Sequence, residues 1–166
     1  MHADALNLVL QHMAQATMAG EVGARQISNI AYGATRSNMR LLMGVLFATL
    51  ARAAEPHFGE FKSQERTNMA WAFARANRSD ALMFAMLMSV VEHCLSEFTV
   101  QGFTSMSWAF ATADQSDDVL FAALGGASER RVGEFKSQEF ANVAWAFAKA
   151  DRLDDLLFAE LASEAG

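Results

Sequence analysis

The amino-acid sequence predicts an all-α fold, a right-handed α-solenoid of stacked helical hairpins with about 37 residues in each repeat. The first observation is a segment that occurs three times, as FKSQERTNMAWAFARA (61–76), FTVQGFTSMSWAFATA (98–113) and FKSQEFANVAWAFAKA (135–150). The tryptophans of these copies stand 37 residues apart each time, at Trp71, Trp108 and Trp145. Self-similarity at a fixed period of this length is typical of repeat arrays, in which stacked units bury a shared core. The second observation is composition: Pro56 is the only proline and 52% of the residues are apolar, which favours helices with an ample core.

The period divides the chain into a half repeat and four repeats. Residues 3–17 resemble the second helix of a repeat, because Leu6, Val9, Leu10 and Met13 recur at helical spacing. A fainter copy of the segment, VGARQISNIAYGATRS, places Tyr32 39 residues before Trp71 and begins the first repeat. No polar terminal repeat closes either end, so we expect this chain to be part of a longer protein. The predicted units are the half repeat 3–17 and the repeats 22–58, 61–97, 98–134 and 135–164.

Each repeat is predicted to hold two helices, which we call the A helix and the B helix. In the first repeat the A helix is expected over residues 24–37 and the B helix over 39–54. The B helix is expected to bury a stripe formed by Leu42, Val45, Leu46 and Leu50. The later B helices carry similar apolar runs, which begin at Leu82, Val119 and Leu156.

Short polar turns separate the A and B helices at 76–80, 113–117 and 150–154. An aspartate closes each turn and can accept hydrogen bonds from the first amides of the B helix, so we expect N-caps at Asp80, Asp117 and Asp154. The corresponding candidates for the A helices are Ser63, Thr99 and Ser137. Phenylalanines between the units are expected to fill the seam between neighbouring repeats, at Phe61, Phe98 and Phe135.

One face of each A helix carries amides, an aromatic ring and usually a cation. At about 100° per residue, Phe73 and its neighbours point toward the B helix, and small alanines point toward the neighbouring A helices. In hairpin arrays one helix of each pair lines the usual binding surface. Amides pair with base edges, flat rings stack on bases and cations meet phosphates, so this face suits single-stranded RNA at about one nucleotide per repeat. The residues of this A-face row are Arg25, Asn29, Tyr32, Arg36, Gln64, Asn68, Trp71, Arg75, Gln101, Ser105, Trp108, Gln138, Asn142, Trp145 and Lys149.

The charge of the chain is distributed unevenly between these helices and the rest. The net charge of −6 argues against nucleic acid, but segments 22–40 and 61–78 each carry +3, segment 98–115 carries −1 and segment 135–152 carries +1. The remaining residues must therefore carry −12. A basic stripe set apart from acidic surroundings is the expected electrostatic pattern of a nucleic-acid groove. The third repeat departs from it, because Thr112 replaces the cation and Asp114 follows.

Structural roles for the same residues stay open. A recurring tryptophan is more often a packing residue between neighbouring helices than a stacking platform. The asparagines also suit an internal hydrogen-bonded ladder, and the cations suit the negative end of the helix dipole. A protein-interaction scaffold, such as a structural subunit of a ribonucleoprotein or ribosome, is the alternative function.

No catalytic or metal-binding motif is found, so we expect neither an enzyme nor a cofactor. The four histidines are scattered, and no pair of residues has metal-ligand spacing such as CxxC or HExxH. The Gly125–Gly126 pair lacks the Lys and Ser/Thr of a phosphate loop. The single Cys94 excludes an internal disulfide and is expected to be a buried filler. No apolar run is long enough to span a membrane, and the N-terminus does not resemble a targeting segment.

The segment FKSQEFANVAWAFAKADRLDDLLFAELA resembles the octotricopeptide repeats and the related FAST-kinase-like and RNA-editing substrate-binding arrays of algal and protist organellar proteins. The resemblance covers residues 22–164 and lies in the AN-x-AWAFA-x-A and LF-x-x-L motifs. It implies a helical-repeat protein of the mitochondrion or chloroplast that binds RNA and acts in its processing, stability or translation, together with other proteins. The chain lacks the Pro-Pro-Pro-Glu-Trp string of the best-known octotricopeptide repeats and has no RAP-like segment. Its RNA target is therefore not implied.

Overall fold

The computed structural model describes residues 22–36 and 43–152, together with positions 8, 11, 12, 15, 16, 19 and 20. This part of the chain is helical and contains no β-strand. The A helices are α2 (Ala24–Ala34), α4 (Ser63–Arg75), α6 (Val100–Thr112) and α8 (Ser137–Lys149). The B helices are α3 (Met43–Ala54), α5 (Ala81–Cys94) and α7 (Asp118–Arg130). Short 3₁₀ turns lead from each B helix to the next A helix: η1 (Glu55–Glu60), η2 (Leu95–Glu97) and η3 (Val132–Glu134).

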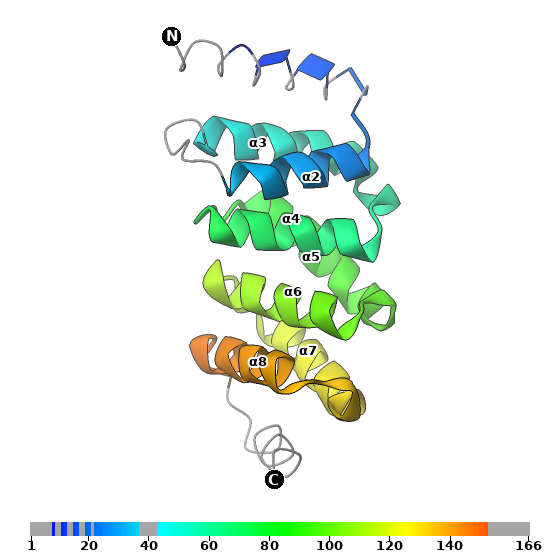
Figure 1. The fold of residues 1–166 in the computed structure, drawn as a ribbon, viewed down its shortest axis with the longest axis vertical. Coiled ribbons are helices and arrows are strands. Elements are labelled where there is room, and N and C mark those ends of the chain that lie inside the picture. Colours follow the sequence, from blue (N-terminus) through cyan, green and yellow to red (C-terminus); the bar gives the residue numbers. More distant parts are fainter. Residues whose placement is uncertain are drawn as a thin grey trace.

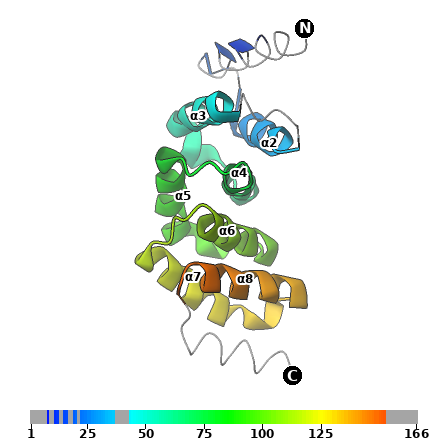
Figure 2. The same ribbon diagram turned by 90° about the vertical axis from the view of Figure 1, so that its left-hand side faces the viewer.

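The helices form two layers. α2, α4, α6 and α8 follow one another along the long axis of the molecule, and α3, α5 and α7 lie behind them (Figures 1 and 2). Consecutive A helices make the most extensive packing contacts, α2 with α4, α4 with α6 and α6 with α8. Small side chains allow this close approach, since Ala72 and Ala74 are both buried, as expected. The fold is therefore all-α and repeat-like, with one face of every A helix on the same side of the stack.

A recurring phenylalanine pair joins each B helix to the A helix of the following unit. Phe47 meets Phe73, Phe84 meets Phe110 and Phe121 meets Phe147, edge to face, with ring centroids 4.7, 5.3 and 5.2 Å apart. All six rings are buried. Edge-to-face pairs contribute about 0.5–1.5 kcal/mol beyond the area that they bury. The same contact thus closes three successive seams of the core.

The linker phenylalanines also lie in these seams. Phe61 and Phe98 are buried, and the half-buried Phe135 contacts Phe103 of the preceding unit, with ring centroids 6.1 Å apart. The prediction that these residues fill the space between units is confirmed for Phe135, and the burial of Phe61 and Phe98 is consistent with it.

The capping predictions are confirmed at three positions and wrong at two. Asp80 and Asp117 each accept a hydrogen bond from a backbone N–H of the B helix, of Met83 and Leu120 respectively, at 3.0 Å. Thr99 caps α6 by accepting from the N–H of Gly102 at 3.1 Å. Asp154 lies outside the described residues.

Ser63 and Ser137 are not caps, because each is the first residue of its helix. The cap position belongs to the preceding lysine, whose own N–H donates to a glutamate three residues later. The donor–acceptor distances are 2.8 Å for Lys62 to Glu65 and 2.8 Å for Lys136 to Glu139. The alignment of the repeats pairs Thr99 with these lysines and not with the serines, which is why the serine prediction failed.

Three of the A helices, α4, α6 and α8, end in a repeated left-handed turn. Asn77, Asp114 and Asp151 have φ values of 55°, 60° and 55°, in a region that Asn and Asp tolerate better than other non-glycine residues. The amide of the next residue bonds back to the helical phenylalanine, from Arg78 to Phe73 at 2.9 Å and from Gln115 to Phe110 at 3.0 Å. This is the Schellman geometry, which satisfies the last carbonyls of a helix. The turns at Asn77 and Asp114 lead the chain from α4 to α5 and from α6 to α7.

Other predictions are corrected in detail. α2 ends at Ala34, before the predicted residue 37. Leu46 and Leu50 are buried as predicted, but Val45 is 68% exposed. Leu42, most of the predicted helix over 3–17 and the B helix of the fourth repeat lie outside the described residues. α7 runs without a break through Gly125 and Gly126. A Cβ at Gly125 would lie 3.6 Å from the Phe147 ring, at ordinary contact distance.

Candidate nucleic-acid interface

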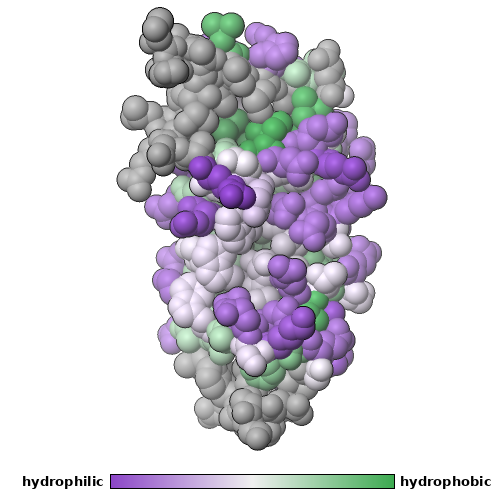
Figure 3. Space-filling view, in the orientation of Figure 1, coloured by the Kyte–Doolittle hydropathy of each residue, from purple (hydrophilic) through white to green (hydrophobic). Residues whose placement is uncertain are grey.

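The A-face row lies at the surface on one side of the stack. Arg25, Asn29 and Arg36 are exposed on or just after α2, and Gln64 and Arg75 on α4. Gln101 is exposed on α6, and Gln138 and Lys149 on α8. Asn68, Ser105 and Asn142 are half-buried. The space-filling view of this side shows a pale band of intermediate hydropathy along the stack, bordered by hydrophilic side chains (Figure 3).

The four aromatic residues of the row form two pairs. Tyr32 and Trp71 pack with ring centroids 5.0 Å apart and planes tilted by 34°. Trp108 and Trp145 stack with centroids 6.4 Å apart and planes 26° apart. Each pair spans two neighbouring A helices. Trp71 and Trp108 are half-buried, whereas Tyr32 and Trp145 are 39% and 45% exposed. The rings therefore pack between units and also present part of their surface to solvent.

The amides of the row pair within a helix and not between repeats. Gln64 Nε2 donates to Asn68 Oδ1 at 3.1 Å in α4, and Gln138 Nε2 donates to Asn142 Oδ1 at 3.2 Å in α8. Among the described residues there is no asparagine ladder that joins one repeat to the next. Each pair keeps the amide group of the asparagine and the carbonyl of the glutamine available to a partner. An edge of this kind, with one donor and one acceptor, matches the hydrogen-bonding edge of a nucleobase.

The cations of the row differ in their partners. Arg25 Nε lies 3.8 Å from Glu65 Oε1, and this pair bridges α2 and α4 with the arginine side chain 74% exposed and the glutamate 12% exposed. Arg36, Arg75 and Lys149 stand at or just beyond the C-terminal ends of their helices. Within the described part of the chain none of these three has a hydrogen-bond or ion-pair partner from its side chain. They are available to an anion such as a phosphate.

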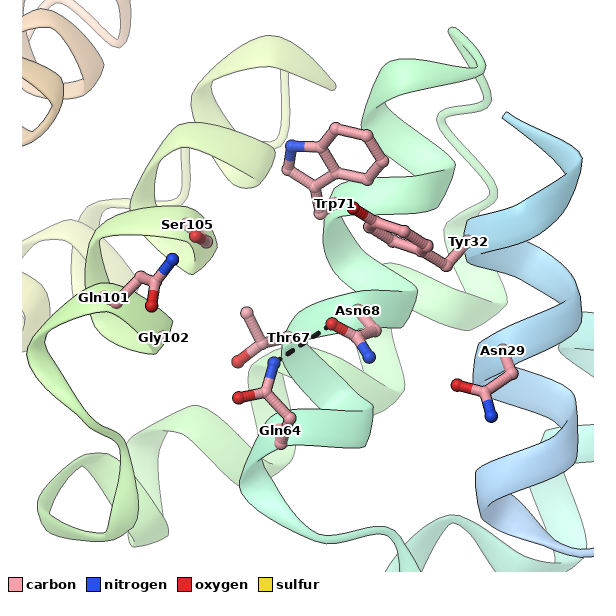
Figure 4. Close-up of a pocket in the computed structure, with 9 residues that line it drawn as sticks. All are labelled: Asn29, Tyr32, Gln64, Thr67, Asn68, Trp71, Gln101, Gly102 and Ser105. Carbon is pink, nitrogen blue, oxygen red and sulfur yellow. Dashed lines mark hydrogen bonds between the residues drawn. The ribbon is translucent and has the colours of Figure 1, made fainter. Parts of the chain in front are cut away.

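A groove opens in the middle of the row, between α4 and α6 and reaching to α2. Its volume is about 470 Å³, within the usual range of ligand sites, about 300–1,000 Å³. Figure 4 shows Gln64 and Thr67 of α4 facing Gln101 of α6 across it, with the Trp71 and Tyr32 rings together at one end. The lining residues are Asn29, Tyr32, Gln64, Thr67, Asn68, Trp71, Gln101, Gly102 and Ser105.

Seven of these nine lining residues belong to the row predicted from the sequence, and the structure brings together members from three repeats. The prediction missed Thr67 and Gly102. Alignment of the repeats already contained a signal, because Gly102 stands where the second and fourth repeats have Glu65 and Glu139.

No protein-family model and no curated protein matches this sequence. Within residues 22–36 and 43–152, no helix is long and apolar enough to cross a membrane. Nor do His, Cys, Asp and Glu side chains gather there in a group that could hold a metal ion.

Proposed function

We propose that this chain is a right-handed α-solenoid whose A-helix face binds single-stranded RNA. The units of the array are those predicted from the 37-residue period. The observation that carries the proposal is the position of amide pairs, aromatic rings and unpaired cations on one continuous face of four neighbouring helices. No catalytic step is part of the proposal, and no cofactor is needed for it.

The three kinds of side chain in the row supply three complementary contacts. Tyr32 and Trp145 offer ring surface for stacking, which contributes about 1–3 kcal/mol per base. The Gln64–Asn68 and Gln138–Asn142 pairs offer donors and acceptors to base edges. Arg36, Arg75 and Lys149 lie along one border of the row, where the sugar–phosphate backbone of a bound strand would pass.

The biological setting follows from the resemblance to organellar repeat proteins. We propose a role in RNA processing, stability or translation in a mitochondrion or chloroplast, within a ribonucleoprotein that contains further proteins. Four units are few for sequence-specific binding, which fits a chain that contributes one part of a longer RNA-binding surface.

The test is a titration of labelled oligouridine of about eight nucleotides, which matches the site sizes of known single-strand binders. Wild type is compared with a variant in which Arg75 and Lys149 are changed to Ala. We expect the double change to weaken binding about 10-fold or more at low salt and to flatten the salt dependence, because two phosphate contacts are lost. A second variant, Asn68→Ala with Asn142→Ala, should weaken binding at all salt concentrations. The proposal would be rejected if the wild-type chain bound none of oligouridine, oligoadenosine and oligocytidine at low salt.

The alternative function is a protein-interaction scaffold, and the third repeat favours it locally. Thr112 and the exposed Asp114 interrupt the line of cations there, so the electrostatic stripe is not continuous. A scaffold predicts weak RNA binding that disappears above about 0.1 M salt, where exposed charges are screened. Retention of partner proteins after nuclease treatment of a pull-down would favour the scaffold over the RNA-binding protein.

A further inference from the structure

We propose that the groove between α4 and α6 is a pocket for a single nucleobase, different in kind from the rest of the A-face row. This inference rests on the proposed function and assigns one site within it. In a row of equivalent repeats each unit would offer the same contacts to the strand. Here the third repeat departs from the others, because Gly102 replaces a glutamate and Ser105 replaces an asparagine on the wall of the groove.

The space between α2 and α4 shows what normally fills it. Glu65 of α4 is only 12% exposed and approaches Arg25 of α2, with 3.8 Å between Nε and Oε1. Its other carboxylate oxygen accepts the N–H of Lys62 and caps the helix, at 2.8 Å. One glutamate therefore caps its own helix and pairs with the neighbouring one. The position equivalent to Glu65 in α6 is Gly102.

A change of cap makes Gly102 possible. In α6 the hydroxyl of Thr99 caps the helix by accepting the N–H of Gly102 at 3.1 Å. A glutamate is then no longer needed three residues after the cap, and its side chain is absent from the groove. A Cβ at Gly102 would lie 3.3 Å from the hydroxyl of Thr67 on α4, so even a small side chain would press on the opposite wall.

A second groove-lining position of α6 also carries a smaller side chain than in the other repeats. Ser105 stands where the second and fourth repeats have Asn68 and Asn142, whose side chains accept a hydrogen bond from a glutamine four residues earlier. The Ser105 side chain is too short to accept this hydrogen bond from Gln101. Gln101, the corresponding glutamine, is exposed and has no side-chain hydrogen bond within the described part of the chain. Both its donor and its acceptor are therefore available at the mouth of the groove.

The chemistry of the lining indicates the class of ligand. None of the nine lining residues is charged, so the pocket does not suit a phosphate or a carboxylate. It offers the amides of Gln64, Asn68 and Gln101, the hydroxyls of Thr67 and Ser105, and the ring of Trp71 (Figure 4). Thr67 donates its proton to Ser63 O at 2.9 Å, so its oxygen faces a ligand as an acceptor. A flat, neutral, hydrogen-bonding heterocycle matches this set, and the base of an RNA strand is such a group.

The sharpest test is Ser105→Asn, which gives the third repeat the residue of the second and fourth. The side chain reaches Gln101 as in those repeats, narrows the groove and occupies the free amide. If the pocket holds a base, affinity for oligouridine of about eight nucleotides should fall about 5- to 150-fold, the range expected for one base–aromatic stack. Affinity for the same sugar–phosphate backbone without bases should stay within about twofold. If all repeats contact RNA alike, the change should leave affinity for oligouridine unaltered or raise it.

The matched control is Ser96→Asn, the same chemical change on the exposed η2 turn, away from the groove. It should leave both affinities unchanged, and circular dichroism should show that both variants fold. An unchanged or higher affinity of Ser105→Asn for oligouridine overturns the base pocket but leaves RNA binding by the face intact. If the wild-type chain binds no RNA homopolymer, both the base pocket and the proposed function are overturned. The A-helix face would then be left with protein binding as its role.

Discussion

Arg66 is the residue at which the equivalence of the repeats predicts a gain in stability. It is 7% exposed, and its Nη2 donates one hydrogen bond to Gly59 O at 3.2 Å. Its Nε is buried without a partner. The same position in the other repeats holds Phe103 and Phe140, which contact Phe135 with ring centroids 6.1 and 5.8 Å apart. The second repeat thus buries a charge where the third repeat buries a ring and the fourth half-buries one.

The change Arg66→Phe should therefore stabilise the protein. It gives up one hydrogen bond, which contributes about 1 kcal/mol. It removes a buried charge, and replacing such charges with apolar residues is neutral or stabilising by about 1–4 kcal/mol. By analogy with the other repeats, a ring at this position can contact Phe61 and Phe98, which adds about 0.5–1.5 kcal/mol. The balance is a gain of about 2 kcal/mol, or about 4–8 °C in melting temperature for a chain of this size.

The assay is urea unfolding followed by far-UV circular dichroism, with Arg75→Phe as the control. Arg75 is exposed, so the same replacement there should change the free energy of unfolding by less than about 0.5 kcal/mol. A loss of stability in Arg66→Phe would refute the reasoning, because it would mean that the guanidinium has a stabilising role that its neighbours do not show.

Two further predictions concern helix ends and pH. Asp117→Ala removes the carboxylate that accepts the N–H of Leu120 and should lower the free energy of unfolding by about 1 kcal/mol, whereas Glu97→Ala, an exposed carboxylate that caps no helix, should have little effect. A loss equal in the two variants would show that the cap is not the cause. Arg131 donates to Glu134 at 2.8 Å, and this hydrogen bond lowers the pKa of the exposed Glu134 carboxyl. Because the folded pKa is below the unfolded one, the stabilisation is present above about pH 4.3 and is lost as pH falls through the folded value. The urea midpoint of Glu134→Gln should therefore be lower than that of wild type at neutral pH and equal to it in acid. A difference in midpoint that persists in acid would show that the charge of the Glu134 carboxylate is not its cause.

The repeat period predicted the arrangement of helices well. Because Trp71, Trp108 and Trp145 recur at one spacing, the faces of the A helices could be assigned by rotation alone, and Phe73 and Ala72 are buried as expected. Val45 was misplaced because its apolar side chain lies at the surface of α3, where it is 68% exposed. An apolar run in a short helix does not reveal which of its members faces the neighbour.

The groove was beyond prediction from a single helix. Corresponding members on α4 and α6 are 37 residues apart in the sequence, and the uncharged lining depends on the replacements at Gly102 and Ser105. Helical rotation shows where a side chain points, but it does not show whether the neighbouring helix fills the space opposite. That required the packing of α4 against α6.

The most direct test of an RNA-binding A-helix face is photo-crosslinking. An oligouridine of about eight nucleotides that carries 4-thiouridine is bound to the wild-type chain and irradiated, and the linked peptides are identified by mass spectrometry. We predict crosslinks to peptides of α4, α6 and α8 that contain Trp71, Trp108 or Trp145, and their loss when unlabelled oligouridine competes. Crosslinks confined to α3, α5 and α7 would contradict the account, because those helices form the opposite layer of the stack.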